Sequence, residues 1–311
     1  MASGPEAIAA VVIALALDRL IGDPPNRYHP VAWLGSLLAV GQRLLGSGSS
    51  PKLLLGGTVV TLSAALLMGA AGWGIEHVAA RLGRASTLVE GGALWLLLAL
   101  RGLAVAARRV ASDLARGDLD AARTTVGHHL VSRPTGALDP GEVASAAVES
   151  VAENLTDSLV APVAFYLTFG VAGAAVYRAV NTADAMIGYR VDTLEYFGKA
   201  AARLDDLLNL VPARLAAGAI VLGAALGGGS VRQAWRVLVR DRARTSSPNA
   251  GWTMAAMAGA LGVTLTKPGV YRLGDGRSPD ASDIERSLRV VGWAALLSII
   301  TLATARCLSS R

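Results

Sequence analysis

The sequence alternates between long apolar stretches and segments rich in charge, proline and glycine. A membrane-spanning helix needs about 20 mostly apolar residues. The stretch at residues 53–75 meets this length, while residues 7–17 need flanking residues and residues 93–107 contain an arginine. The pattern predicts an all-α, polytopic integral membrane protein with about four to six transmembrane helices. The apolar stretches cover residues 7–17, 53–75, 93–107, 155–180, 213–226 and 290–305.

The composition agrees with a membrane protein. Hydrophobic residues make up 53% of the 311 residues and charged residues only 17%, and the mean hydropathy is +0.47. The 35 glycines belong to the small residues that let transmembrane helices approach closely. The one cysteine, Cys307, excludes an intramolecular disulfide and a paired-cysteine zinc site. We expect residues 1–311 to form a single integral membrane domain.

The basic residues are distributed unevenly among the polar segments. Residues 18–52, 108–154 and 230–288 hold four, five and nine Lys and Arg, more than the segments between them. By the positive-inside rule, these three segments face the cytoplasm and both termini lie outside if all six stretches cross. The net charge of +6 is therefore explained by topology, and we expect membrane lipid, not nucleic acid, as the surrounding partner. The predicted location is the cytoplasmic membrane.

The first polar cluster follows the first apolar stretch, at residues 18–31. Its prolines make the segment extended and stiff, and it carries Asp23 and His29 among several other charged groups. Such a segment can hold polar side chains in fixed positions for a substrate. The alternative is a loop whose charges simply face water.

The second polar cluster is an acidic series at residues 149–158. Glu149, Glu153 and Asp157 are four residues apart, so on an α-helix they line one face. Like charges at this spacing repel, and the series therefore favours a nearby cation, either Mg²⁺ or a basic side chain. The alternative is a solvated acidic first turn that the helix dipole stabilises.

The third polar cluster spans residues 177–206. Asn181 and Asp184 share one face of a predicted helix, and Lys199, Arg203 and Asp206 share one face of another. Two cations one turn apart suit phosphate oxygens, and Asp205 or Asp206 can bind a metal that bridges them. A salt-bridged helix is the alternative, but polar groups beside a membrane are costly unless they have a function.

The fourth segment, residues 246–263, is predicted to be mainly a helix that packs against the rest of the protein. Ser247 can cap a helix whose apolar face consists of Met254, Met257 and Leu261. Asn249 stays near the start of that helix, where it can contact a polar ligand.

At these clusters the sequence resembles the cobalamin-biosynthesis CobD/CbiB family of adenosylcobinamide-phosphate synthases, which are integral membrane proteins. The resemblance runs nearly end to end. It implies an ATP- and Mg²⁺-dependent ligase that joins adenosylcobyric acid, a corrinoid, to aminopropanol or aminopropanol phosphate through an amide bond. The motifs that carry it are LDRLIGDPPNRYHPVAWLG, ESVAENLTDSLVAPVAFY, VYRAVNTADAMIGYR, YFGKAAARLDDLLNLVPARL, SPNAGWTMAAMAGALGV and KPGVYRLG.

Such a reaction assigns expected roles to the polar clusters. It needs a metal for the nucleotide phosphates, cations for the developing charge and a base for the attacking ammonium. The sequence has no GxxxxGK[ST] loop, so a nucleotide site would be of another kind. The expected catalytic residues are Glu149, Glu153, Asp184 and Lys199, the substrate-binding residues are Asp23, His29, Asn181, Arg203 and Asn249, and the metal ligands are Glu153, Asp157, Asp184 and Asp206.

The topology and the expected chemistry conflict at one point. Six spans place residues 181–212 outside, whereas ATP is cytoplasmic. Four spans remove the conflict if residues 155–180 and 213–226 form a re-entrant or cytoplasm-facing helical pair, and we prefer this version. Contact with other cobalamin-pathway enzymes is a further expectation.

Two other function classes stay open. One is a membrane prenyl or phospho-alcohol transferase, because NTADAMIGYR is similar to motifs that bind Mg²⁺-diphosphate, although the repeated DxxxD pattern is missing. The other is a non-enzymatic sensor or transporter, which does not need three polar clusters.

Overall fold

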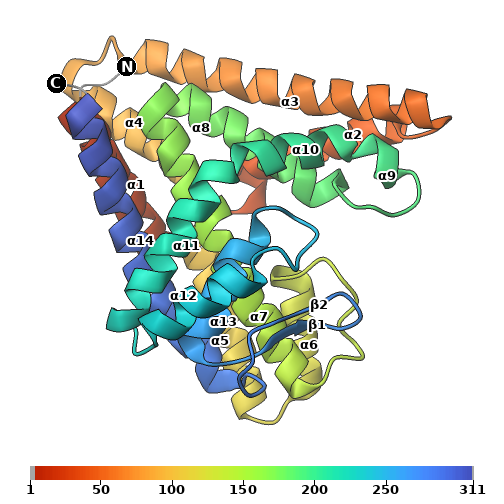
Figure 1. Ribbon diagram of the computed structural model, residues 1–311. Helices are drawn as coiled ribbons and strands as arrows, with labels where there is room; N and C mark the ends of the chain where they lie inside the picture. Colours follow the sequence, from red (N-terminus) through yellow and green to blue (C-terminus); the bar gives the residue numbers. More distant parts are fainter. Residues whose placement is uncertain (1–3, 310–311) are drawn as a thin grey trace. The chain divides into compact units, whose positions relative to one another are not determined.

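The computed structural model describes residues 4–309, in which the chain forms two compact units (Figure 1). The first unit contains residues 4–99, 161–209 and 302–309, and the second contains residues 100–160 and 210–301. The units are described separately below.

Helices are the only regular secondary structure among the described residues of the first unit. His29 starts one of its helices by accepting a hydrogen bond from the Val31 N–H at Nδ1 (3.2 Å), directly before Pro30. Proline suits the first helical turn because its missing N–H has no partner there. The elements are α1 (Gly4–Leu20), η1 (Asn26–Tyr28), α2 (Pro30–Leu45), α3 (Ser50–Ala79), η2 (Gly83–Ala85), α4 (Ser86–Trp95), α8 (Ala161–Ile187), α9 (Leu194–Phe197), α10 (Lys199–Leu208) and the end of α14 (Ala281–Ser309).

The core of this unit lies where α2, α3 and α8 meet the segment of α9 and α10. Leu38, Ile187 and Phe197 are fully buried there. Gly57 of α3 lies directly against the Phe197 carbonyl oxygen, so a β-carbon at this position would overlap the backbone. The close approach fixes α9, and with it the start of α10, against α3.

A kink divides α8 at Gly170, whose φ of 70° and ψ of −162° are not helical. This φ favours glycine. The kink frees backbone groups, and the Ala172 N–H donates to the Glu76 carboxylate of α3 (3.4 Å). Close by in the chain, the Tyr166 hydroxyl donates to Glu90 of α4 (2.6 Å). Both carboxylates thus satisfy polar groups in the apolar first half of α8.

The second unit is also mainly helical and contains a short hairpin. Asp139 and Glu142 form a capping box at the start of α7, and Gly262 ends α13 in the left-handed conformation. The elements are α5 (Leu100–Ala115), α6 (Leu119–His129), α7 (Pro140–Leu155), the π-helix η3 (Thr156–Val160), α11 (Leu210–Leu226), α12 (Val231–Asp241), α13 (Ala250–Leu261), β1 (Leu265–Lys267), β2 (Tyr271–Leu273) and most of α14. The two strands are antiparallel, with Leu265 opposite Leu273.

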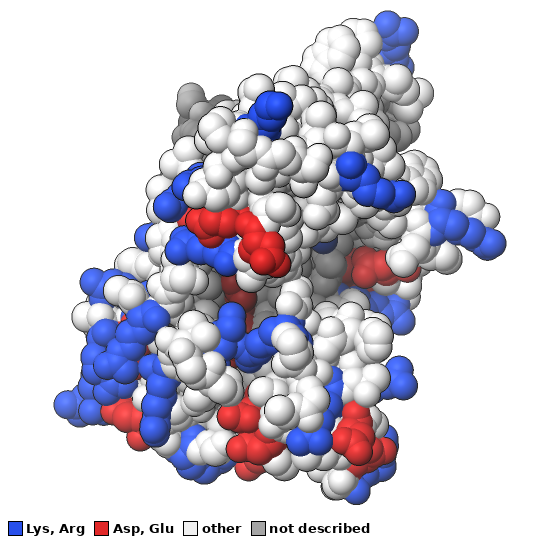
Figure 2. Space-filling view, turned by 90° about the vertical axis from the view of Figure 1, so that its right-hand side faces the viewer, with Lys and Arg blue, Asp and Glu red and all other residues white. Residues whose placement is uncertain are grey.

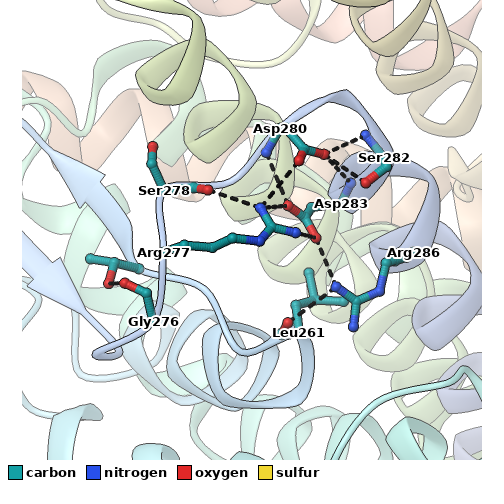
Figure 3. Close-up of polar contacts among 9 residues, drawn as sticks. Leu261, Gly276, Arg277, Ser278, Asp280, Ser282, Asp283 and Arg286 are labelled. Atoms are coloured by element: carbon teal, nitrogen blue, oxygen red, sulfur yellow. Dashed lines mark hydrogen bonds and ion pairs between the residues drawn. The ribbon is translucent and has the colours of Figure 1, made fainter.

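A buried carboxylate holds the start of α14 (Figure 3). Asp283 is fully buried and accepts hydrogen bonds from Arg277 (2.7 and 3.0 Å) and Arg286 (2.8 Å). Asp280 accepts from the Ser282 hydroxyl (2.6 Å) and backbone N–H (2.8 Å). Arg286 also donates to the Leu261 carbonyl (3.1 Å), which ties α14 to the end of α13.

A second buried carboxylate, Asp241 at the end of α12, leads to a pH-dependent prediction. It accepts hydrogen bonds from Arg240 (2.8 Å) and from the Gly274 N–H (2.8 Å), and it forms an ion pair with Arg244 (3.1 Å). Burial alone would raise the pKa of Asp241, but the hydrogen bonds from Arg240 and Gly274 outweigh burial and hold its pKa below the ordinary value. The stability that ionised Asp241 contributes is therefore present above about pH 4 and lost as the pH falls further.

We expect Asp241→Asn to lower stability by about 2 kcal/mol at pH 7. The difference from wild type should shrink as the pH falls below about 4. Thermal unfolding in detergent at a series of pH values measures both effects. Asp275→Asn is the control, because this half-exposed aspartate also binds Arg240 (2.7 Å) and its loss should leave the unfolding temperature near that of wild type. An equal difference at every pH would contradict the role given to Asp241.

Four helical segments among the described residues are long and apolar enough to cross a membrane, or up to five if the bent pair of α10 and α11 counts as one span. Only 33% of the most apolar part of α3 is buried, and 22% of that of α14, so the large apolar surfaces of these helices need lipid. Figure 2 likewise shows charged side chains gathered on parts of one face and large areas without charge. The four segments are Ser50–Ala79, Gly83–Ala115, Pro140–Ile187 and Ala281–Ser309.

The expected all-helical polytopic fold with four to six spans is confirmed, and all six apolar stretches lie mainly in helices. Two details differ from the sequence prediction. Residues 93–107 do not form one continuous helix, because α4 ends at Trp95 and α5 begins at Leu100. Residues 155–180, which our four-span version removes from the membrane, lie in one of the four candidate membrane-spanning segments. α1, which that version counts as a span, is not among these candidates. The side of each loop and the single-domain assignment stay predictions.

Candidate functional site

A group of aspartates lies where the end of α8 meets α10. The carboxylates of Asp205 and Asp206 are near enough to Asp184 to repel its charge. Asp205 is held by two amides, Asn181 (3.2 Å) and Asn209 (3.0 Å). The structure therefore brings together Asn181, Asp184 and Asp206, which the sequence assigned to a site, and Asp205, which the sequence offered as an alternative to Asp206.

A pocket of about 140 Å³ opens beside these aspartates. Lys199, Arg203 and Asp206 all line it, as expected for residues that share one face of a helix. The Arg203 guanidinium lies 3.7 Å from the Asp206 carboxylate and is two-thirds exposed, so most of its hydrogen-bonding groups still face solvent. The sequence prediction did not include three further polar residues of the lining, Tyr189, Arg190 and Glu195.

The N-terminal candidates lie in the same unit. His29 is half-buried, and its pKa is lowered by burial and by the charge of Arg178, against the opposing effect of Asp23. The neutral ring accepts the Val31 N–H at Nδ1, which leaves Nε2 to carry the proton. His29 thus caps a helix and can still donate one hydrogen bond.

Arg178 connects the two groups of candidates. Its guanidinium donates to the Asn181 side chain (3.4 Å), and Asn181 in turn donates to Asp205. The arginine also interacts electrostatically with His29. Seven of the predicted residues therefore belong to one polar region of the first unit, namely Asp23, His29, Asn181, Asp184, Lys199, Arg203 and Asp206.

Glu149 is held differently, inside the second unit. Its carboxylate is buried and accepts hydrogen bonds from Ser145 (2.9 Å), Tyr271 (3.0 Å) and Arg133 (3.4 Å). Burial and the Glu149 charge raise the pKa of Tyr271 well above its ordinary value, so its hydroxyl stays a donor. The acidic series predicted a nearby cation, either Mg²⁺ or a basic side chain. At Glu149 that cation is the Arg133 side chain. Both carboxylate oxygens are occupied by protein groups.

Glu153 continues the series from Glu149 within α7, but Asp157 does not. Glu153 lies in α7, whereas Asp157 lies in the π-helix that follows. A π turn widens the hydrogen-bonding pattern to i→i+5, so the three acids do not follow the single α-helical face that their spacing predicted. Both side chains are half-buried. π turns occur frequently at functional sites.

Asn249 lies at the N-cap of α13, in the second unit. Its side-chain oxygen accepts a hydrogen bond from Arg214, whose guanidinium stacks on the Trp252 ring at 4.6 Å. Ser247 accepts the Asn249 and Ala250 N–H groups (3.2 and 3.4 Å), but the N-cap residue of α13 is Asn249, two residues after the predicted cap. Met254, Met257 and Leu261 are buried, as the packing interpretation predicted.

The chemistry of the donors can be compared with that of Mg²⁺. Within residues 4–309, no three His, Cys, Asp or Glu side chains form a group that could hold a metal ion. A closed, all-protein cage is therefore not present in this part of the chain. Mg²⁺ in nucleotide sites is usually held by one or two carboxylates, with phosphate oxygens and waters completing its shell, and the aspartates beside the pocket fit that kind of site.

Fold and site together define a multi-pass helical membrane protein with a pocket that carries both cations and carboxylates. The family described as CobD/Cbib protein matches residues 11–291. The probable cobalamin biosynthesis protein CobD of Methanothermobacter thermautotrophicus is 39% identical over 299 residues, 96% of this chain and 97% of the relative. CobD of Dehalococcoides mccartyi is 39% identical, with 88% and 89% covered, and CobD of Citrobacter koseri is 37% identical, with 97% and 98% covered.

The chain therefore belongs to the CobD/CbiB family of cobalamin biosynthesis proteins, as the motifs indicated. No solved structure matches it.

Proposed function

We propose that this protein is a ligase of cobalamin biosynthesis that joins adenosylcobyric acid to aminopropanol or aminopropanol phosphate through an amide bond, using ATP and Mg²⁺. The pocket of the first unit, with Lys199, Arg203 and Asp206 in its lining, is the observation that carries the proposal. Family membership supports the pathway, and the pocket supports a phosphate-bearing substrate.

The reaction defines what the protein must supply. A carboxylate does not condense with an ammonium group unaided, and ATP with its Mg²⁺ ion would supply the phosphoryl group that activates the carboxylate. In the net reaction the C–N bond forms, one carboxylate oxygen leaves on inorganic phosphate, and the ammonium group loses two protons. The protein must therefore hold phosphate oxygens and accept protons.

The cations of the pocket suit the first task. Lys199 is exposed, with its amine 5.7 Å from the Tyr196 ring centre, and Arg203 offers a planar guanidinium. An ammonium acts as a point charge, whereas a guanidinium can bind two phosphate oxygens at once. We assign both residues to phosphate oxygens that gain charge during the reaction.

The carboxylates suit the second task. Asp184 lies near the carboxylates of Asp205 and Asp206, and we assign it to the ammonium proton. Asp206, beside Asp184 and in the pocket, would hold Mg²⁺ together with phosphate oxygens. Asn181 and Arg203 would orient the substrate, and we keep Glu153 and Asp157 as proposed metal ligands of the second unit.

The remaining assignments concern the surroundings of the site. Asp23 and His29 would contact polar groups of the corrinoid, and Asn249 keeps its proposed contact with substrate in the second unit. We place the protein in the cytoplasmic membrane, in contact with other enzymes of the pathway.

Corrinoid-dependent release of ADP tests the proposal. Purified protein should release ADP only when adenosylcobyric acid, the amine and Mg²⁺ are all present. Asp184→Asn should lower this rate by about 100-fold or more, the range of general acid–base contributions, without altering the stability of the detergent-solubilised protein. ADP release at the same rate without the corrinoid would contradict a ligase, and so would the absence of ADP release with every combination of substrates. Either result would favour a transferase or a transport protein.

A further inference from the structure

The outer face of α12 combines apolar and basic side chains. One side of the helix is buried through Ala234, Val237 and Leu238. The neighbouring flank of the helix exposes Val231, Trp235 and Val239, each four residues apart, and 59% of Trp235 is accessible. Side chains at this spacing form one stripe along a helix, so a tryptophan and two valines face away from the unit together.

Arginines border this stripe. Arg232 and Arg236 are exposed beside Trp235. Residues 231–244 contain five arginines and one aspartate, a net charge of +4. The one aspartate is the buried Asp241, which forms ion pairs with Arg240 and Arg244. Arg236 interacts electrostatically with the half-exposed Asp275, and the exposed side chains of Arg232 and Arg236 still face the surroundings.

The packing of α12 prevents this face from turning inward. Gly259 of α13 lies so close to the Gln233 carbonyl oxygen that a β-carbon would overlap it. Ser230 accepts the Gln233 N–H (3.2 Å) at the start of α12, and its own N–H donates to the Ala260 carbonyl (3.1 Å). The start of the helix and its inner side are thus fixed on α13.

The neighbouring helix continues the apolar surface. α11 is apolar along its length and exposes Leu222 and Leu226 in its last turns. A glycine turn at residues 227–229 then leads directly into α12. The basic helix therefore begins where an apolar helix ends, the place at which a chain leaves the acyl region of a bilayer.

We propose that α12 lies on the membrane surface and binds anionic phospholipids. The stripe of Val231, Trp235 and Val239 would enter the boundary of the acyl chains, and Arg232 and Arg236 would bind headgroup phosphates. Amphipathic helices with tryptophan on one side and arginine on the other lie in this interface, and each basic residue near an anionic surface strengthens binding about fivefold. The inference concerns lipid contact and is independent of the ligation chemistry.

Site-directed spin labelling of the full-length protein tests this inference. A nitroxide is placed at Val239→Cys in a Cys307→Ser background, and the protein is reconstituted in vesicles of phosphatidylcholine alone or mixed with phosphatidylglycerol. Collisions with oxygen report immersion in lipid, and collisions with a water-soluble nickel chelate report exposure to water. We expect an immersed label in the mixed vesicles and a smaller immersed population in phosphatidylcholine alone.

Arginine substitutions identify the contact. Arg236→Gln should lower the ratio of immersed to water-exposed label about fivefold, and Arg232→Gln should act similarly. Arg272→Gln, which removes an exposed arginine from β2, is the matched control and should leave the ratio unchanged. If the nickel chelate collides with the label in both vesicle types, the proposal is overturned. The face of α12 would then lie in water or contact an acidic protein partner. Equal immersion in both types would overturn the recognition of anionic headgroups.

Discussion

Lys199→Ala should lower turnover by about 100- to 1000-fold while the protein still folds and inserts. The reason is the position of Lys199 in the lining of the pocket, beside Arg203. The loss of one preorganised group that stabilises transition-state charge costs this much in other enzymes. An exposed ion pair on a helix contributes only about 0.3 to 0.5 kcal/mol, which cannot produce such a loss. Turnover is measured with adenosylcobyric acid, ATP and aminopropanol phosphate at matched protein levels.

The matched control is Lys52→Ala, which removes an exposed lysine of the same unit outside the pocket, and it should retain wild-type turnover. Arg203→Lys should also be impaired, because an ammonium cannot reproduce the two parallel hydrogen bonds of a guanidinium. Wild-type rates in both Lys199→Ala and Arg203→Lys would remove the pair from the site and leave α10 as scaffold.

Glu149→Ala should destabilise the protein by about 3 to 5 kcal/mol, because it leaves Arg133 largely buried without its carboxylate. Arg133 is only 19% exposed, and its guanidinium lies 3.4 Å from Glu149. In the same variant the hydroxyl of Tyr271, a residue of β2, loses the carboxylate that accepts its hydrogen bond. Thermal unfolding in detergent measures the loss.

A double variant separates structure from catalysis. Glu149→Leu combined with Arg133→Met removes both charges and should recover part of the stability, because apolar pairs of similar size can replace a buried ion pair. If Glu149→Ala instead keeps wild-type stability and loses turnover, the carboxylate acts in the reaction, as the sequence first suggested. Glu153→Gln, one turn along the helix, should change turnover more than stability if Glu153 binds metal.

Local spacing predicted the parts of the site that lie on one element. The interval of four residues between Lys199 and Arg203 places both in one pocket, because residues at i and i+4 share a helix face. The start of α13 and its buried methionines follow equally from local signals. The same reasoning found the helices, since the apolar stretches were long and their boundaries were marked by proline, glycine and charge.

The long-range partners could not be read from the sequence. Tyr271 lies 122 positions from Glu149 and Asn181 lies 24 positions from Asp205, and no periodicity connects such residues. Arg178, which links His29 to Asn181, was missed because an arginine inside an apolar stretch has no local signature of its partner. The π turn at Thr156 and the kink at Gly170 also depend on tertiary packing, since Glu76 from α3 satisfies the backbone that the kink frees.

The most direct test of the central claim is formation of the amide itself. Aminopropanol and aminopropanol phosphate, each labelled with ¹⁵N, are incubated separately with adenosylcobyric acid, ATP, Mg²⁺ and the membrane-reconstituted protein, and the corrinoid products are analysed by mass spectrometry. The account predicts a corrinoid that carries the labelled nitrogen in an amide, formed with one ADP per product and at least 100-fold more slowly by Lys199→Ala. Unchanged adenosylcobyric acid with both amines, in a preparation that folds and inserts normally, would contradict it.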